Sequence, residues 1–174
     1  MNTVTLDDML AVATPQDVLD KIDLSNSPLL DQLARSCAKV TNRPHVNVYL
    51  YSATEVYTLG SYNPLNLRAK RTIFDPILNK PYFEFDDISK HFENKDNFAY
   101  EDGEQVMRAF AVATIKIAGE TVGGVSVYDF VEREPLNETQ KEFLINAANL
   151  AACVIETKAR LKTTLMNAFS LANF

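Results

Sequence analysis

The side chains in this sequence that could do chemistry stand at alternate positions of two apolar segments, 46–51 and 125–128. Because successive side chains of a strand point to opposite faces, the valines and leucine would share one face and the other residues the second. The residues expected on that second face are Asn47, Tyr49, Tyr51, Ser126 and Tyr128. Aromatic walls with a few polar groups are typical of pockets for small molecules. The alternative is a second small core in which the tyrosines pack under loops.

Further candidate binding residues lie between positions 87 and 110, and they combine charged, imidazole, thioether and aromatic groups. They are Asp87, His91, Phe98, Met107, Arg108 and Phe110. An imidazole can contact a polar ligand or bind a haem iron. A partly exposed histidine at the end of a helix is the simpler interpretation of His91, so haem is disfavoured.

The sequence contains no residue pattern for catalysis. It has no nucleophile elbow, phosphate-binding loop or paired Cys–His arrangement. Two cysteines, Cys37 and Cys153, and two histidines lie too far apart in sequence for a structural zinc site. The acidic residues of 84–104 lack the spacing of a calcium loop. We therefore expect a protein that is not an enzyme and holds no metal.

The chain has 174 residues and a formal net charge of −6. Segment 84–104 alone holds eight acidic residues against two lysines, a balance equal to that of the whole chain. An acidic protein is a poor general binder of nucleic-acid phosphates. The N-terminus lacks the basic region of a signal peptide, and no apolar stretch is long enough to cross a membrane. We expect a cytoplasmic protein that binds neither nucleic acid nor membrane.

Hydrophobic periodicity places these residues on a sequence of helices and strands. Two short helical pieces are expected in the first 27 residues, and one or two helical turns near 89–100. The other expected elements are a helix over 28–41, strands over 46–51, 56–59 and 82–88, a hairpin of 109–117 and 121–129, and a long helix from Asn137, whose capping box includes Gln140. An antiparallel sheet with helices on one face is the economical arrangement, which is an α+β fold.

Three segments, in order, resemble a GAF domain, a family of small-molecule sensor modules. They are YFEFDD at 82–87, RAFAVATIKIAGETVGGVSVYD at 108–129 and EREPLNETQ at 132–140, and the resemblance covers about residues 28–157. Thr114 stands where many members have proline. The resemblance implies an antiparallel sheet of about five to six strands with the N- and C-terminal helices on one face. It also implies a pocket on the other face, covered by the segment between the third strand and the hairpin.

The resemblance further implies a non-catalytic sensory domain that binds a small molecule and relays its state through its terminal helices. Cyclic-nucleotide-binding members carry an Asn-Lys pair where this chain has Asp129 and Phe130. Bilin-binding members and free methionine-sulfoxide reductases of this fold need pocket cysteines. Cys37 and Cys153 lie on apolar helical stripes, where we expect both to be buried, with a contact between them as an alternative. Neither bilin attachment nor reductase activity is expected, and the ligand stays unidentified.

The final helix continues beyond the expected domain. Its apolar residues there are Leu161, Leu165, Met166, Phe169, Leu171 and Phe174. Such residues need a partner surface, which a homodimer or a signalling partner protein would supply. We therefore expect an N-terminal helical extension (1–27), a GAF-like domain (28–157) and a helical continuation (158–174). The alternative function is a structural dimerisation or protein-interaction module with a degenerate pocket.

Overall fold

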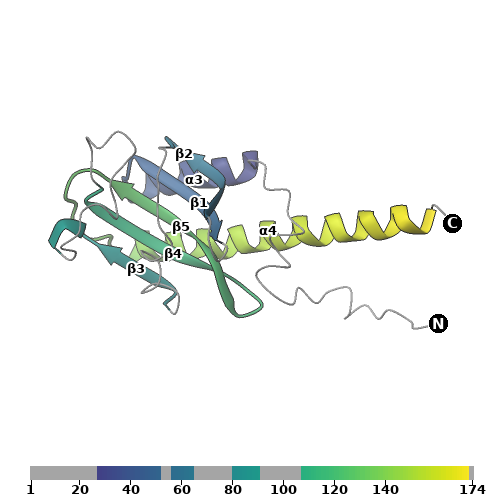
Figure 1. Cartoon of the computed structure of the whole chain (residues 1–174). Coiled ribbons are helices and arrows are strands. Elements are labelled where there is room, and N and C mark those ends of the chain that lie inside the picture. Colours follow the sequence, from purple (N-terminus) through teal and green to yellow (C-terminus); the bar gives the residue numbers. More distant parts are fainter. Residues whose placement is uncertain (1–26, 52–55, 65–79, 91–106, 173–174) are drawn as a thin grey trace.

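The computed structural model describes residues 27–51, 56–64, 80–90 and 107–172. In this part of the chain a five-stranded antiparallel sheet lies against two helices, so the fold has two layers (Figure 1). The strand order is β2-β1-β5-β4-β3. The elements are α3 (Pro28–Thr41), β1 (His45–Tyr51), β2 (Val56–Tyr62), β3 (Tyr82–Phe85), the 3₁₀ helix η3 (Ile88–Lys90), β4 (Ala109–Ile117), β5 (Glu120–Asp129) and α4 (Glu138–Ala172). The expected α+β class is confirmed.

Helix α3 lies against β2 and β1, and its ends follow from local sequence. Pro28 occupies the first turn, where its missing N–H costs nothing. The helix ends at Asn42, which adopts a left-handed conformation with φ of 52°. Leu30 packs so closely on β2 that a Cβ added to Gly60 would lie 2.5 Å from the Leu30 Cβ. Glycine at this position therefore permits the contact between helix and sheet.

The hairpin of β4 and β5 forms the middle of the sheet. Its two-residue turn places Ala118 at φ 53° and Gly119 at φ 83°, the left-handed pair that matches the twist of hairpin strands. Strand β5 then pairs with β1, with Val46 opposite Val127. A Cβ on Gly123 would lie 2.0 Å from the carbonyl oxygen of Tyr49, so this strand pair needs glycine there. The hairpin expected from the sequence is confirmed.

The alternation of side chains divides the buried residues between the two faces of the sheet. The helix-facing residues of β1 and β5, all completely buried, are Val46, Val48, Leu50, Val125 and Val127. Seven residues of α4 belong to this core: Leu144, Ala147, Ala148, Ala151, Ala152, Ile155 and Ala159. The expected division of β1 and β5 between the two faces of the sheet is confirmed. The opposite face carries a separate buried cluster, described below.

Helix α4 begins with the expected capping box. The Asn137 side chain accepts a hydrogen bond from the Gln140 N–H, and the Gln140 side chain accepts one from the Asn137 N–H, both at 3.0 Å. The helix then runs without a break to Ala172, and its last turns extend away from the sheet (Figure 1). No helix in the described part of the chain is both long and apolar enough to span a membrane. The domain boundary at residue 157 stays a prediction.

Three details differ from the sequence expectations. Strand β2 continues through Gly60 to Tyr62, because Gly60 pairs with Val48 of β1 instead of ending the strand. Strand β3 stops at Phe85, and Ile88 lies in η3, where its N–H donates to the Arg108 carbonyl oxygen at 2.6 Å. Cys153 is exposed. The helical pieces expected in 1–27 and most of the turns expected in 89–100 lie outside the described residues.

Candidate functional site

The sheet face opposite the helices carries seven buried residues that we call the aromatic face. They are Tyr49, Tyr51, Ile88, Met107, Phe110, Val112 and Tyr128, and the most exposed of them shows 7% of its surface. Four partly buried residues pack against them: Val56, Phe83, Phe85 and Phe130. These residues come from all five strands, η3 and the segment before β4. The fold therefore collects tyrosine, phenylalanine and methionine side chains in one place.

A glycine on β5 makes room for the central tyrosine. Tyr49 of β1 pairs with Gly124 of β5 in the strand register. A Cβ on Gly124 would lie 2.8 Å from the Tyr49 Oη and 3.1 Å from its Cζ, so the phenol ring lies directly over the glycine. Burial raises the pKa of Tyr49 well above its usual range, and nearby Tyr51 raises it further. The hydroxyl therefore stays protonated and can donate a hydrogen bond.

Polar groups surround Tyr128 at the other end of the aromatic face. The Asn47 side-chain amide donates to the Tyr128 Oη at 3.3 Å. His45 stacks on the Tyr128 ring with centroids 5.2 Å apart, and its Nδ1 lies 2.9 Å from the Asn63 carbonyl oxygen. Because a carbonyl can only accept, Nδ1 carries the proton in this hydrogen bond. These contacts fix the orientation of the Tyr128 ring within the cluster.

An ion pair lies beside the aromatic face. The Asp87 side chain is 1% exposed and accepts hydrogen bonds from two nitrogens of Arg108, Nη2 and Nε, the second at 3.3 Å. Glu132 is a weaker partner, 3.5 Å from Arg108 Nη2. The hydrogen bond with Asp87 raises the pKa of Arg108. Asp87 precedes Ile88 and Arg108 follows Met107, and both Ile88 and Met107 belong to the aromatic face. The ion pair therefore connects the start of η3 to the segment before β4.

The structure brings together most of the binding residues proposed from the sequence. Tyr49, Tyr51, Met107, Phe110 and Tyr128 belong to the aromatic face, and Asp87 and Arg108 form the ion pair beside it. Ser126 is buried on β5, opposite Asn47 on one side and Val112 on the other. His91 and Phe98 lie outside the described residues. Ligand contact by any of these residues stays a prediction.

Sequence reasoning missed several members of the aromatic face. Phe83 and Phe85 alternate with Tyr82 and Glu84 along β3, so their period of two was a usable signal. Val112 stands two positions after Phe110 in the expected strand 109–117, so alternation was a usable signal there too. Ile88 carried none, because an isolated aliphatic residue fits either face. His45 was also outside the proposed site, yet it stacks on Tyr128.

The two cysteines lie apart from this cluster. Cys37 is buried in the helix-side core, and burial raises its pKa to about 12. Cys153 is exposed on α4, which contradicts the expectation that both thiols are buried. Cys153 points away from the sheet, because residues 144, 148, 151 and 155 form the face of α4 that packs in the helix-side core. In the described part of the chain no group of three or more potential metal ligands lies close together.

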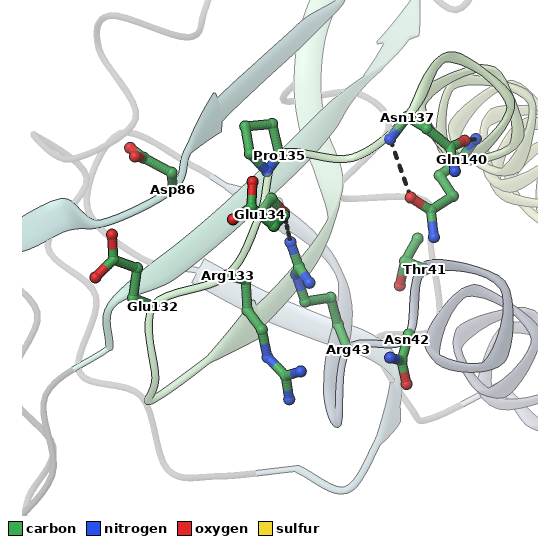
Figure 2. A pocket seen from close by; sticks show the side chains of 10 residues that line it. All are labelled: Thr41, Asn42, Arg43, Asp86, Glu132, Arg133, Glu134, Pro135, Asn137 and Gln140. Atoms are coloured by element: carbon green, nitrogen blue, oxygen red, sulfur yellow. Dashed lines mark hydrogen bonds between the residues drawn. The ribbon is translucent and has the colours of Figure 1, made fainter.

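A hollow of about 630 Å³ lies at the C-terminal end of α3 and is also lined by Glu132, which contacts Arg108 of the ion pair (Figure 2). Its polar lining includes Thr41, Arg43, Asp86, Glu132, Arg133 and Gln140. Figure 2 shows the Arg43 side chain bonded to the backbone of Glu134, with Arg133 nearby. Sequence analysis did not propose this hollow as a site, because its residues come from three separate segments of the chain.

Comparison with known proteins rests on structure. No protein-family model matches the chain, and no curated protein does. Among solved structures, the blue-light absorbing PixJ GAF domain of Thermosynechococcus elongatus superposes with a TM-score of 0.61 at 12% identity, covering 90% of this chain and 96% of that one. The GAF domain of an Acinetobacter phosphoenolpyruvate-protein phosphotransferase gives 0.59 at 16% identity, covering 89% and 94%.

A third similar structure is a domain of a putative two-component sensor histidine kinase from Sinorhizobium meliloti, with a TM-score of 0.56 at 9% identity. It covers 77% of this chain and 94% of that one. The low identities mean that the shared property is the arrangement of sheet and helices. This chain has the GAF fold.

Proposed function

We propose that this protein is a non-catalytic sensory or regulatory domain that binds a small molecule on its aromatic face and relays its state through α3 and α4. The observation that carries the proposal is the aromatic face itself, a buried cluster that combines aromatic rings with hydroxyl and amide groups. The fold supports it, since domains of a light-absorbing protein and a putative sensor kinase share this architecture.

The composition of the aromatic face indicates the chemistry of the ligand. Ring faces and the Met107 thioether favour a largely apolar or planar molecule. The Tyr49 and Tyr128 hydroxyls and the Asn47 amide provide a few directed hydrogen bonds. Asp87 and Arg108 satisfy each other's charge, so no strong field selects an anion at this point. A neutral or cationic ligand fits best, held without a covalent bond because no cysteine belongs to the cluster.

The ligand-bound state would be relayed to the helices through strands that contribute side chains to both faces of the sheet. Strands β1 and β5 carry the aromatic face on one side and the helix-side core on the other, one residue apart along the chain. A shift of Tyr49 therefore moves Val48 and Leu50, which pack in the core shared with α3 and α4. Close-packed cores transmit such displacements because they contain few voids.

Native mass spectrometry of the full chain tests ligand binding. We expect a non-covalent adduct of defined mass, either as purified or after incubation with a panel of neutral and cationic metabolites. Tyr49→Ala should lose the adduct, because it removes the ring at the centre of the aromatic face. Tyr62→Ala is the matched control, since Tyr62 is an exposed tyrosine on β2. An adduct retained equally by both variants would contradict the proposed site.

A second candidate function is dimerisation, favoured by the outer face of the helices. The large apolar side chains exposed there are Leu29, Leu150, Leu161, Leu165, Met166 and Phe169. A shallow hollow of about 200 Å³ between α3 and α4 continues this face and is lined by Leu29, Leu33, Leu150 and Val154. We propose that a second copy of the chain covers it, because the same apolar face on both copies forms a self-complementary interface.

Light scattering and analytical ultracentrifugation test this second function. The double variant Leu161→Glu with Leu165→Glu should convert the dimer to monomer, because it places charge in the apolar interface. Asn167→Glu adds charge on the opposite side of the same helix and should leave the dimer intact. A wild-type protein that is monomeric at all concentrations would contradict dimerisation and leave ligand binding untouched.

A further inference from the structure

A second, smaller hollow adjoins the one in Figure 2 and shares Asn42, Arg43 and Arg133 with it. We call it the basic hollow. Its volume is about 240 Å³, and its polar lining consists of Lys39, Asn42, Arg43, Tyr62 and Arg133. Among the residues that the structure describes, three cations and no acid line it, although the protein as a whole carries a net charge of −6. Pockets for organic ligands usually exceed 300 Å³, so this one fits a small charged group.

Arg43 is the central residue of the basic hollow. It is 7% exposed, and in the described part of the chain its guanidinium makes one hydrogen bond, from Nη2 to the Glu134 carbonyl oxygen at 2.7 Å. It forms no ion pair with a described carboxylate. A guanidinium has five N–H donors, and a buried charge is costly unless it is paired. Arg43 thus has donor capacity that the described protein atoms leave unused.

Nearby acceptors are already occupied. Glu84 accepts from the Tyr82 hydroxyl at 2.6 Å and from the Leu136 N–H at 2.7 Å. Two carbonyls in the last turn of α3 also have donors: that of Ala38 the Arg43 N–H, and that of Val40 the Gln140 side chain. None of these groups accepts a hydrogen bond from the Arg43 side chain, although the charge of Glu84 acts on it.

Arg133 is partly neutralised. Its Nε and Nη2 atoms lie 2.7 and 2.6 Å from one carboxylate oxygen of Asp129. Burial lowers the pKa of Arg43 and the neighbouring Arg133 guanidinium adds to this shift, whereas the Glu84 and Asp129 carboxylates oppose it. An anion between the two arginines would offset both the burial and the repulsion. Of the three acids that line the larger hollow, Asp86 and Glu132 pair with Lys90, and Glu134 lies beside Arg43 (Figure 2).

We infer that the basic hollow is a binding site for a phosphate group, held by the guanidinium of Arg43 with Arg133 and Lys39 as charge partners. The planar fork of an arginine matches the oxygens of a phosphate, and three cations suit its double charge. The site lies at the end of α3, and none of its lining residues belongs to the aromatic face, so it is a different site from the one proposed above. Either free phosphate or a phosphomonoester could supply the group.

Titration of the full chain with inorganic phosphate at constant ionic strength tests the inference. Backbone amide NMR signals of Asn42 and Arg43 should shift saturably. Lys39→Gln should raise the dissociation constant for phosphate about two- to fivefold, because it removes one exposed charge. Arg43→Gln should raise it about tenfold or more. Lys116→Gln removes an equally exposed lysine on β4, outside the hollow, and should change nothing.

The remaining variants and ligands separate the outcomes. If Arg43→Gln does not fold, Lys39→Glu replaces it, because an added acid at the rim should abolish binding. Tighter binding of glycerol phosphate would identify a phosphomonoester as the preferred ligand, and tighter binding of inorganic phosphate would identify the free ion. Both results support the site. Acetate binding as tightly as phosphate would overturn the assignment to a phosphate group. Absence of saturable shifts, or equal weakening by Lys39→Gln and Lys116→Gln, would overturn the site itself.

Discussion

The two faces of the sheet are built from the same strands and have different chemistry. The helix-facing side of β1 and β5 is wholly aliphatic, with valines and a leucine that are completely buried. The aromatic face has tyrosine hydroxyls and, beside them, an amide and a serine. Buried polar groups cost free energy unless they are hydrogen-bonded, so a face built only for stability would omit them. On the aromatic face this cost is offset by hydrogen bonds such as those of Tyr51 to Thr121 and of Asn47 to Tyr128, so the two faces are stabilised in different ways.

The largest expected effect is on the helix-side core. Leu144→Ala truncates a completely buried side chain and should lower the free energy of unfolding by about 2–5 kcal/mol, measured by urea denaturation. Asn149→Ala, at an exposed position of the same helix outside the proposed dimer face, is the control and should change it by less than about 0.5 kcal/mol. Equal losses would show that the helix-side core does not carry the stability.

Overpacking of the aromatic face should have a smaller effect on stability. Gly124→Ala places a Cβ 2.8 Å from both the Tyr49 Oη and the Val112 Cγ2, so these side chains must move. We expect a loss of about 1–3 kcal/mol. The urea midpoint gives the cost, and near-ultraviolet circular dichroism reports the tyrosine environment. An unchanged spectrum would mean that the Tyr49 ring does not lie over Gly124.

Removal of one hydroxyl should cost still less. Tyr128→Phe keeps the ring and its stacking on His45 but removes the acceptor of the Asn47 amide. We expect a loss of about 1 kcal/mol in the free energy of unfolding. Tyr62→Phe, at an exposed position, serves as control. A Tyr128→Phe variant as stable as the wild type would show that the hydrogen bond contributes nothing.

The smallest effect is a dependence on alkaline pH. Burial raises the pKa of Cys37 from 9.0 to about 12, so the folded state keeps a proton that the unfolded state loses. The stabilisation is complete below pH 9 and is lost progressively as pH rises toward 12. At about pH 9.5 the loss is roughly 0.8 kcal/mol. Cys37→Ala should remove this part of the dependence, and an identical pH profile in the variant would contradict the assignment.

Alternation and capping patterns predicted much of the fold. The period of two in 46–51 and 125–128 assigned each residue to the correct face, and Asn137 and Gln140 marked the start of α4. Gly60 was misinterpreted as a strand end, because its close contact with Leu30 depends on how α3 packs on the sheet. Cys153 was placed in the core because the sequence shows apolar stripes on α4 without showing which one meets the sheet.

The sequence predicted most residues of the candidate site but not which of them contact one another. The aromatic residues followed from alternation and from the GAF resemblance. The pairing of Asp87 with Arg108 joins positions 21 residues apart, and no local pattern specifies such a contact. The basic hollow combines the end of α3 with the segment after β5, and each arginine alone resembles an ordinary surface residue in sequence.

Thermal unfolding of the full chain against a panel of neutral and cationic metabolites, repeated with Gly124→Ala, tests the central claim most directly. A ligand that binds only the folded state raises the unfolding midpoint as its concentration increases. At one hundred times its dissociation constant it adds about 2.7 kcal/mol to the free energy of unfolding. We predict at least one such compound for the wild type and no response in Gly124→Ala, whose aromatic face is obstructed. A compound that stabilises both proteins equally, or the failure of every compound, would contradict the claim that the aromatic face is a binding site.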